Sequence, residues 1–416
     1  MKKLIASASL VAVGTAGLQA ADSYGLTREE SSKPWSISAS LRGFYDDNFA
    51  AASKDFKEES FGMEFSPAFA LNFPMEQTYL RLGYIYSLKY YFDRDDDQAD
   101  HSHDLGLKLE HRFSERYKVT LTDSFVYAQE PEVIDENTLT TFRTEADAFR
   151  NRAAADLTIQ LTELLGLSLG YQNLWYDYKQ EGDFSRSALL DRMEHLFRID
   201  TRWQMQEHLV GLVGYQYGIT DYTSENFITT DVLGNGLARG DDRDNTAHYF
   251  YVGANYAFSS QLNGEARVGV RYTDYDNGDE DWSPYIDLVG TYTYSPGSFV
   301  QLGLRQDHNA TDVAGSGSDI TTDQETSTVY ASLTHRITPQ LTARIDGHYQ
   351  RGVFNGGNLD GDVDNFFLAG INLEYRLNNN WAAETGYNYD RLDSDGGANR
   401  GSYTRNRVYI GVRASY

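Results

Sequence analysis

Apolar and polar residues alternate in stretches of about ten residues from residue 35 onward, which is the period of a β-strand with two different faces. In the first stretch, Trp35, Ile37 and Leu41 alternate with serines and with Arg42. Leucines and tyrosines alternate in the same way with arginine, serine and lysine along much of the remaining chain. The pattern predicts an all-β protein.

Counting these stretches predicts nine hairpins and about 18 strands, at 35–43, 61–73, 78–92, 103–113, 117–128, 146–161, 166–178, 192–203, 208–219, 246–258, 262–273, 282–294, 298–305, 326–337, 341–353, 366–377, 381–392 and 402–416. The hairpin 146–178 is the weakest of the set. Its segment Ala153–Leu169 also fits a short helix, and Leu174-Trp175-Tyr176 breaks the alternation as a bulge would. Without this hairpin the count is 16.

Short and long connections take turns along the chain. Tight turns lie at 73–77, 114–116, 259–261, 295–297, 338–340 and 378–380, and long polar links lie at 46–60, 93–102, 129–145, 179–191, 220–245, 274–281, 306–325, 354–365 and 393–401. This sorting is typical of a transmembrane antiparallel β-barrel with short periplasmic turns and long extracellular loops. An even number of strands leaves both ends of the barrel in the periplasm.

The first 20 residues have the features of a secretory signal peptide. A cationic start, Met1-Lys2-Lys3, precedes the uncharged stretch Leu4–Leu18 and the small-residue site Leu18-Gln19-Ala20. The stretch is too short for the alternative, a single membrane anchor. We therefore expect a signal peptide at 1–20, a short periplasmic segment at 21–33 and one barrel domain at 34–416. So short a lead-in favours passive transport over an energised, plugged transporter.

Composition and charge exclude several other classes of protein. The mean hydropathy of −0.55 excludes a bundle of membrane-spanning helices. The net charge of −25 argues against a nucleic-acid binder, and the absence of cysteine excludes disulfide scaffolds and thiol catalysis. A barrel accommodates this composition because only its lipid face must be apolar.

The last strand ends in alternating apolar residues, Val408, Ile410, Val412 and Ala414, and then in Tyr416. This ending resembles the C-terminal signature of bacterial outer-membrane proteins. The resemblance implies that the barrel-assembly machinery reads the strand that ends at Tyr416.

Five segments between Pro34 and Val133 carry a second resemblance: 45–48 (YDDN), 65–74 (FSPAFALNFP), 90–94 (YYFDR), 113–117 (FSERY) and 129–132 (QEPE). In these segments the chain resembles the putative beta-barrel porin 2 family of outer-membrane proteins. The resemblance implies a barrel in the bacterial outer membrane and does not name a solute.

No catalytic set stands out, so we expect neither an enzyme nor a cofactor. The chain has no His-Glu-x-x-His metal motif and no Gly-x-Ser-x-Gly nucleophile elbow. His101 and His103 lie beside Asp100 and Asp104 and could hold a metal ion. Because Asp100 and His101 fall in the predicted loop 93–102 and His103 and Asp104 follow it directly, solvated loop residues are the favoured interpretation, and we predict no metal site.

Charge divides between the long loops and the strands. The loops 93–102, 220–245, 274–281, 306–325 and 354–365 hold 24 acidic residues and three basic ones, which predicts a negative outer rim. The strands place charged residues on the predicted lumen face, where they either set selectivity or stiffen the wall as salt bridges. The predicted lumen-lining residues are Arg42, Glu64, Arg81, Lys108, Glu110, Arg198, Arg267, Asp287, Arg305, Arg344, Asp346 and Glu384. The third outer loop is the predicted constriction, with Glu130, Glu132, Asp135, Glu136 and Arg143.

Together these features predict an outer-membrane porin through which small hydrophilic solutes or ions diffuse passively. The expected partners are outer-membrane lipids, the barrel-assembly machinery and the solutes, with a homo-oligomer also possible and no nucleic acid. Three alternatives stay open at this point: a barrel for export of surface polysaccharide, a structural barrel with a plugged lumen, and an outer-membrane enzyme.

Overall fold

The computed structural model describes residues 33–129, 147–230, 236–317, 319–395 and 401–416. Eighteen long strands form one closed antiparallel sheet. They are β1 Trp35–Asp46, β2 Ser60–Pro74, β3 Thr78–Tyr91, β4 Ala99–Arg112, β5 Tyr117–Ala128, β6 Ala148–Gln160, β7 Leu165–Tyr178, β8 Arg192–Gln206, β9 Leu209–Tyr222, β12 Asn245–Ala257, β13 Leu262–Tyr275, β14 Glu280–Ser295, β15 Ser298–Asn309, β16 Asp323–Arg336, β17 Leu341–Asn355, β18 Val363–Arg376, β19 Trp381–Ser394 and β20 Tyr403–Ser415. The predicted barrel and its 18 strands are confirmed.

The hairpin 146–178 consists of the regular strands β6 and β7, so the helix alternative and the count of 16 are wrong. Leu174 and Tyr176 both point inward, and the pairing of β7 with its neighbours shows no register shift there, so the expected bulge is absent. The pattern misled because these inner positions are apolar. They are apolar because a loop helix, α1 Arg186–Leu190, packs against them.

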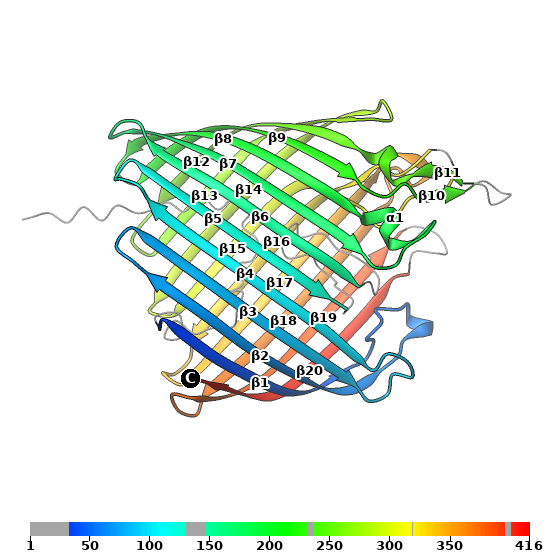
Figure 1. Ribbon diagram of the computed structural model, residues 1–416, viewed down its shortest axis with the longest axis horizontal. Coiled ribbons are helices and arrows are strands. Elements are labelled where there is room, and N and C mark those ends of the chain that lie inside the picture. Colours follow the sequence, from blue (N-terminus) through cyan, green and yellow to red (C-terminus); the bar gives the residue numbers. More distant parts are fainter. Residues whose placement is uncertain (1–32, 130–146, 231–235, 318, 396–400) are drawn as a thin grey trace, which may run out of the picture.

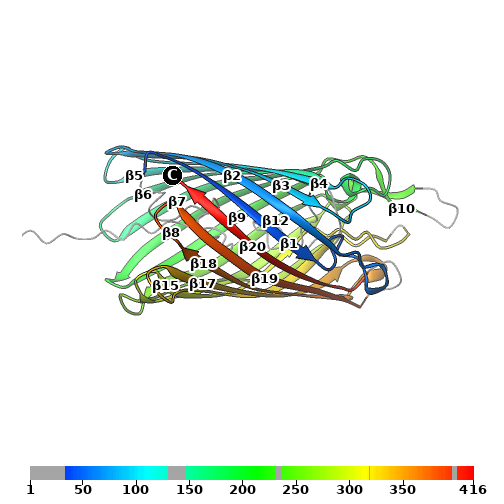
Figure 2. The same cartoon turned by 90° about the horizontal axis from the view of Figure 1, so that it is seen from below.

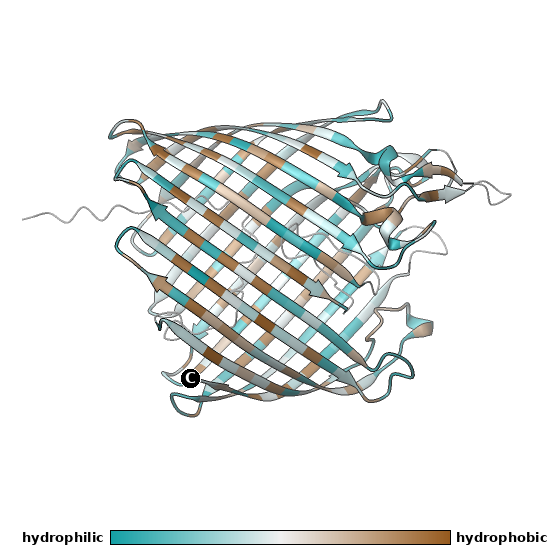
Figure 3. Cartoon of the chain, in the orientation of Figure 1, coloured by the Kyte–Doolittle hydropathy of each residue, from teal (hydrophilic) through white to brown (hydrophobic). Residues whose placement is uncertain are grey.

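The alternating pattern sorts side chains between the outside of the wall and its inside. On β1, Trp35, Ile37 and Leu41 are about half exposed, whereas Ser36 and Ser38 are buried. Figure 3 shows the resulting mixture of hydrophobic and hydrophilic residues along each strand. The apolar side chains point outward because lipid surrounds the wall, and the polar set points into the lumen.

The barrel has two unlike ends (Figure 1). The short turns and Tyr416 lie at one end, which by the topology of such barrels faces the periplasm. The long loops, with α1 and the small hairpin β10 Phe227–Thr230 and β11 Gly236–Arg239, lie at the other end. Seen after a quarter turn, the barrel is narrower, so its cross-section is flattened (Figure 2). No helix among the described residues has the length and apolar character needed to cross a membrane.

Several strands reach further into the outer loops than predicted. β4 begins at Ala99, inside the predicted loop 93–102, and β15 and β16 take both ends of the predicted loop 306–325. The acidic residues at these ends can belong to strands because side chains on the lumen side donate hydrogen bonds to them. Asp323, for example, accepts a hydrogen bond of 2.5 Å from the Tyr275 hydroxyl.

The first and last strands close the barrel. The backbones of Ile37 and Tyr416 exchange two hydrogen bonds of 2.9 and 3.2 Å, and the rings of Trp35 and Tyr416 lie 5.5 Å apart. Near the other end of the same joint, Arg405 binds the Asp46 carboxylate through Nε at 2.9 Å and Nη2 at 2.5 Å. Recognition of this C-terminal strand by the assembly machinery stays a prediction.

Candidate functional site: the lumen wall

A cavity of about 530 Å³ lies against the inner face of strands β4–β9 and β12–β16. Its wall combines charged groups with tyrosine, threonine and amide side chains. Among the predicted lumen residues, Lys108, Arg198, Asp287 and Arg305 line it. The cavity is therefore polar and chemically mixed.

Charged side chains on the wall are largely paired with each other. On β8, the guanidinium of Arg198 binds Asp156 on β6 and lies 3.6 Å from Asp200, which also accepts a 2.5 Å hydrogen bond from Tyr251. The contacts of Arg198 with Asp156 and of Tyr251 with Asp200 join different strands and so brace the wall.

A second group of pairs lies across β13, β14 and β15. Arg267 is 3.5 Å from Asp287, and Asp307 lies 3.3 Å from both Arg271 and Arg305. Asp307 falls in the predicted loop 306–325, so the sequence interpretation missed it. Arg305 occupies an inward position, and the next inward position along the same strand is Asp307.

A third group joins the first two strands of the chain to the last two. Arg42 on β1 lies 3.3 Å from Glu64 and 2.8 Å from Glu384, and its guanidinium stacks 4.9 Å from the ring centre of Tyr409. Arg42 thereby links β1, β2, β19 and β20.

The remaining predicted wall residues have other environments. Glu110 binds Lys108 at 2.8 Å, and Asp346 accepts a 2.7 Å hydrogen bond from Ser332. Arg81 faces Lys108 across the β3–β4 pair, and Arg344 is exposed on β17. The predicted constriction residues Glu130, Glu132, Asp135, Glu136 and Arg143 all lie outside the described residues.

Glycines on the wall accommodate tyrosine rings that lie flat against it. A Cβ atom at Gly303 would lie 2.1 Å from Cζ of Tyr330, and one at Gly214 would lie 2.3 Å from Cζ of Tyr251. Sequence reasoning missed these pairs, although glycine inside a strand signals a close approach. Flat rings leave more of the lumen free.

Three outer loops pack together over the lumen. We call this the loop cluster: Ala188, Ile228, Ala238, Ala314 and Ile320, which form a small buried apolar core. Their loops are 179–191, 223–244 and 310–322, and α1 lies within the first of them (Figure 1).

Arg243 ties these loops together from a fully buried position. Its guanidinium donates hydrogen bonds to the carbonyl oxygens of Leu189, Thr311 and Val313 at 3.3, 3.1 and 2.6 Å. It is one of only three basic residues in the acidic loops considered above. A rare basic residue among many acidic ones was the signal in the sequence that could have identified Arg243, and the sequence analysis did not use it.

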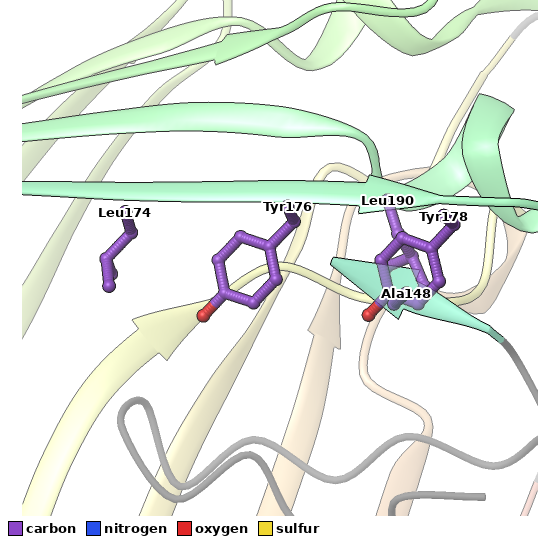
Figure 4. Packing of buried hydrophobic residues seen from close by; sticks show 5 residues of the cluster. All are labelled: Ala148, Leu174, Tyr176, Tyr178 and Leu190. Carbon is purple, nitrogen blue, oxygen red and sulfur yellow. The ribbon is translucent and has the colours of Figure 1, made fainter. Parts of the chain in front are cut away.

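The base of the loop cluster rests on β7. Tyr176 and Tyr178 point to the same side of this strand, and Tyr178 lies beside Leu190 of α1 and Ala148 of β6 (Figure 4). The loops are thus anchored to the wall by packing and are not simply solvated.

Two carboxylates next to the loop cluster have raised pKa values. Burial, reinforced by the nearby Asp221, Asp276 and Asp241, raises the pKa of Asp244 to about 6. Burial also raises the pKa of Asp191, which follows α1. Both are sites where acidification changes the charge that the loops carry.

His101 and His103 are not in a loop, because β4 already includes them. Within the described part of the chain, no group of three or more histidine and acidic side chains is arranged to hold a metal ion. The two imidazoles lie on the outward face, each hydrogen-bonded to a tyrosine, whereas Asp100 is buried on the alternate face.

Solved structures similar to this chain include the siderophore receptor PirA from Acinetobacter baumannii, with 11% identity over 91% of this chain and 80% of that chain, at a TM-score of 0.44. They also include the outer membrane protein OpdK from Pseudomonas aeruginosa, with 11% identity over 92% and 99% of the two chains, at a TM-score of 0.45. A third is OccK2 (OpdF) from Pseudomonas aeruginosa in complex with glucuronate, with 10% identity over 92% and 98%, at a TM-score of 0.46.

No curated protein matches the chain. A family model does match, over residues 37–416, which is nearly the whole barrel. The family is described as Putative beta-barrel porin 2, in agreement with the resemblance noted from the first quarter of the chain. The protein is therefore an outer-membrane β-barrel of the Putative beta-barrel porin 2 family.

Proposed function

We propose that the barrel is a passive diffusion channel for small hydrophilic solutes and ions. The observation that carries the proposal is the cavity of about 530 Å³ on the inner face of a closed 18-stranded wall. A barrel of this strand number leaves an aqueous interior. The proposal requires no catalytic group and no cofactor, because a wet lumen by itself removes the hydrocarbon barrier.

The pairing of wall charges supports a general filter. Arginines in the lumen sit beside carboxylates at 2.8–3.6 Å in the pairs of Arg42, Arg267, Arg271 and Arg305 and in the contact of Arg198 with Asp200. A paired wall offers hydrogen-bond donors and acceptors along the path without a strong net field. We therefore propose that charge selection arises mainly at the acidic outer rim, and that the wall admits polar solutes of either sign.

The test is single-channel current through folded, heat-modifiable protein in a planar bilayer with potassium chloride. We expect steady current steps from one barrel and a measurable flux of small sugars or amino acids in liposome swelling. Folded protein that inserts and carries no current would contradict the proposal.

The second candidate is an export barrel closed at rest, and the loop cluster is the observation that favours it. Its loops pack inward around the buried Arg243. An Arg243→Met variant distinguishes the two candidates. A diffusion channel conducts before and after the change, whereas a barrel held closed by this packing conducts only after it.

A further inference from the structure

The outward face of the barrel carries a repeated pairing of tyrosine with histidine that channel function does not use. We call the four histidines, His101, His103, His195 and His248, the histidine belt. Each accepts or shares a hydrogen bond of 2.8 Å between its Nδ1 atom and a tyrosine hydroxyl of the neighbouring strand. The four tyrosines are Tyr86, Tyr84, Tyr171 and Tyr215, respectively.

The geometry is the same in three separate strand pairs. Tyr84 faces Leu105 in the sheet and bonds the histidine two residues before it, His103. Tyr171 faces Phe197 and bonds His195, again two residues before.

Tyr215 faces Phe250 and bonds His248 in the same diagonal arrangement. The repetition of one geometry on β3–β4, β7–β8 and β9–β12 is hard to attribute to the packing of any one pair.

The belt lies on the outer half of the wall, and the outward positions on its periplasmic side are apolar. Two residues further along each strand, toward the periplasm, stand Leu105, Phe197 and Phe250, which are 47%, 46% and 51% exposed. The histidines themselves are only partly exposed. Partly polar rings such as tyrosine and histidine are typical of the level at which lipid headgroups meet a barrel wall.

The pairing determines what the belt presents to its surroundings. When the tyrosine hydroxyl donates to Nδ1, the neutral imidazole carries its proton on Nε2, and this N–H is then the donor that the ring offers to a ligand. A phosphate group, with three acceptor oxygens, matches a row of such donors.

Lys179, directly after β7, adds positive charge between the histidines of β4 and the histidine of β8. Nζ of Lys179 lies 4.2 Å from the ring centre of Phe149, and the ring of Tyr127 lies between Phe149 and His103 at 4.8 and 6.1 Å. The carboxylate of Asp177 lies 3.2 Å from this lysine and partly balances it.

Among the described residues, the strands β17–β20 on the opposite side of the barrel show no such tyrosine–histidine pair. There the tyrosines at the same level bond amides: Tyr349 bonds Asn365 at 2.9 Å and Tyr387 bonds Asn406 at 2.7 Å. We infer that the β3–β12 side of the barrel binds phosphorylated headgroups of outer-leaflet lipid through the histidine belt, while the β17–β20 side does not.

The test measures lipid bound to the purified, folded barrel by native mass spectrometry. The probes are lipid A with two phosphates and the same lipid with both phosphates removed. In the test variant, His101, His103, His195 and His248 are all replaced by phenylalanine, which keeps the ring and removes the donors. We expect about tenfold weaker binding of the phosphorylated probe, and no change for the dephosphorylated one.

A matched control uses two histidines at the periplasmic end of the barrel, on β4 and β16. His111 and His335 form the same kind of bond, with Thr78 and Tyr294, each at 2.7 Å. The His111→Phe/His335→Phe variant should bind phosphorylated lipid as the unaltered barrel does.

Three outcomes would overturn the inference: equal binding of both probes, full binding by the fourfold variant, or loss of binding in the control variant instead. A change of oligomeric state in the fourfold variant, without loss of lipid, would assign the surface to a second copy of the chain. Because no current is measured, these outcomes do not depend on whether the lumen conducts.

Discussion

Asp46 and Arg405 form the most completely buried ion pair at the joint between β1 and β20. Their side chains are 2% and 1% exposed, and Nε and Nη2 of the arginine both bind the carboxylate. A buried pair of this kind contributes little net stability when intact, but removing one partner leaves an uncompensated charge.

We therefore expect Arg405→Met to lower the stability of the closed barrel by about 3–5 kcal/mol, because Asp46 is left buried and unpaired. The double variant Arg405→Met/Asp46→Leu should recover much of this loss. The temperature at which the barrel loses its compact electrophoretic mobility measures both.

Arg391→Met is the control, since its pair with Asp393 is about half exposed and such pairs contribute about 0–1 kcal/mol. If Arg405→Met and Arg391→Met unfold at the same temperature, the buried pair does not hold the joint.

At the scale of elements, the strands could be predicted from sequence and the loops could not. Alternation along 35–43 or 402–416 follows from lipid on one side and water on the other, so it is visible in the sequence itself. Packing between loops depends on which distant segments meet. Nothing near Arg243 in the sequence reveals that it reaches Val313, 70 residues away.

The same limit applies to the wall. Alternation placed Arg42 and Glu384 on the same face, but their contact across 342 residues appears only once the barrel closes. The acidic stretch before His101 has the composition of a loop and so predicts a loop up to residue 102, yet the strand already begins at Ala99.

The loop cluster should tighten as the pH falls. In the folded loops the pKa of Asp244 is about 6, above the value of about 3.9 for an unfolded chain, so ionisation opposes the folded arrangement. This opposition is complete above pH 6 and is lost below about pH 4. Asp191 shifts in the same direction.

Limited proteolysis of the outer loops, with a protease active at both pH values, should therefore be slower at pH 5 than at pH 8. The Asp191→Asn/Asp244→Asn variant should be protected equally at both. Glu225→Gln, an exposed change in the same loop as Asp244, should keep the pH dependence. A pH dependence that survives the double variant would contradict this account.

At the scale of the whole molecule, charge is unevenly distributed from one end to the other. The five acidic loop ranges hold 24 acidic and three basic residues, whereas the charges of the wall are mostly paired. Clefts lined by one sign of charge concentrate ions of the other sign.

We expect a reversal potential that favours potassium over chloride, more strongly at 0.1 M than at 1 M salt, because the Debye length falls from about 10 Å to about 3 Å. Replacing the exposed Asp95, Asp96 and Asp97 by asparagine should reduce the preference. The control removes three exposed glutamates at the other end, Glu76→Gln, Glu115→Gln and Glu163→Gln. An equal effect of both triple variants would rule out the outer rim as the filter.

The joint between β1 and β20 also has a consequence in time. Seventeen of the eighteen pairings in the barrel join strands that are consecutive among the barrel strands along the chain, but the last one joins the two ends of the chain, through residues such as Ile37 and Tyr416. Until it forms, the growing sheet has two open edges whose backbone groups cannot remain unpaired in hydrocarbon. The first strand to leave the ribosome must therefore wait for the last, and a chain cut short anywhere would keep an open edge.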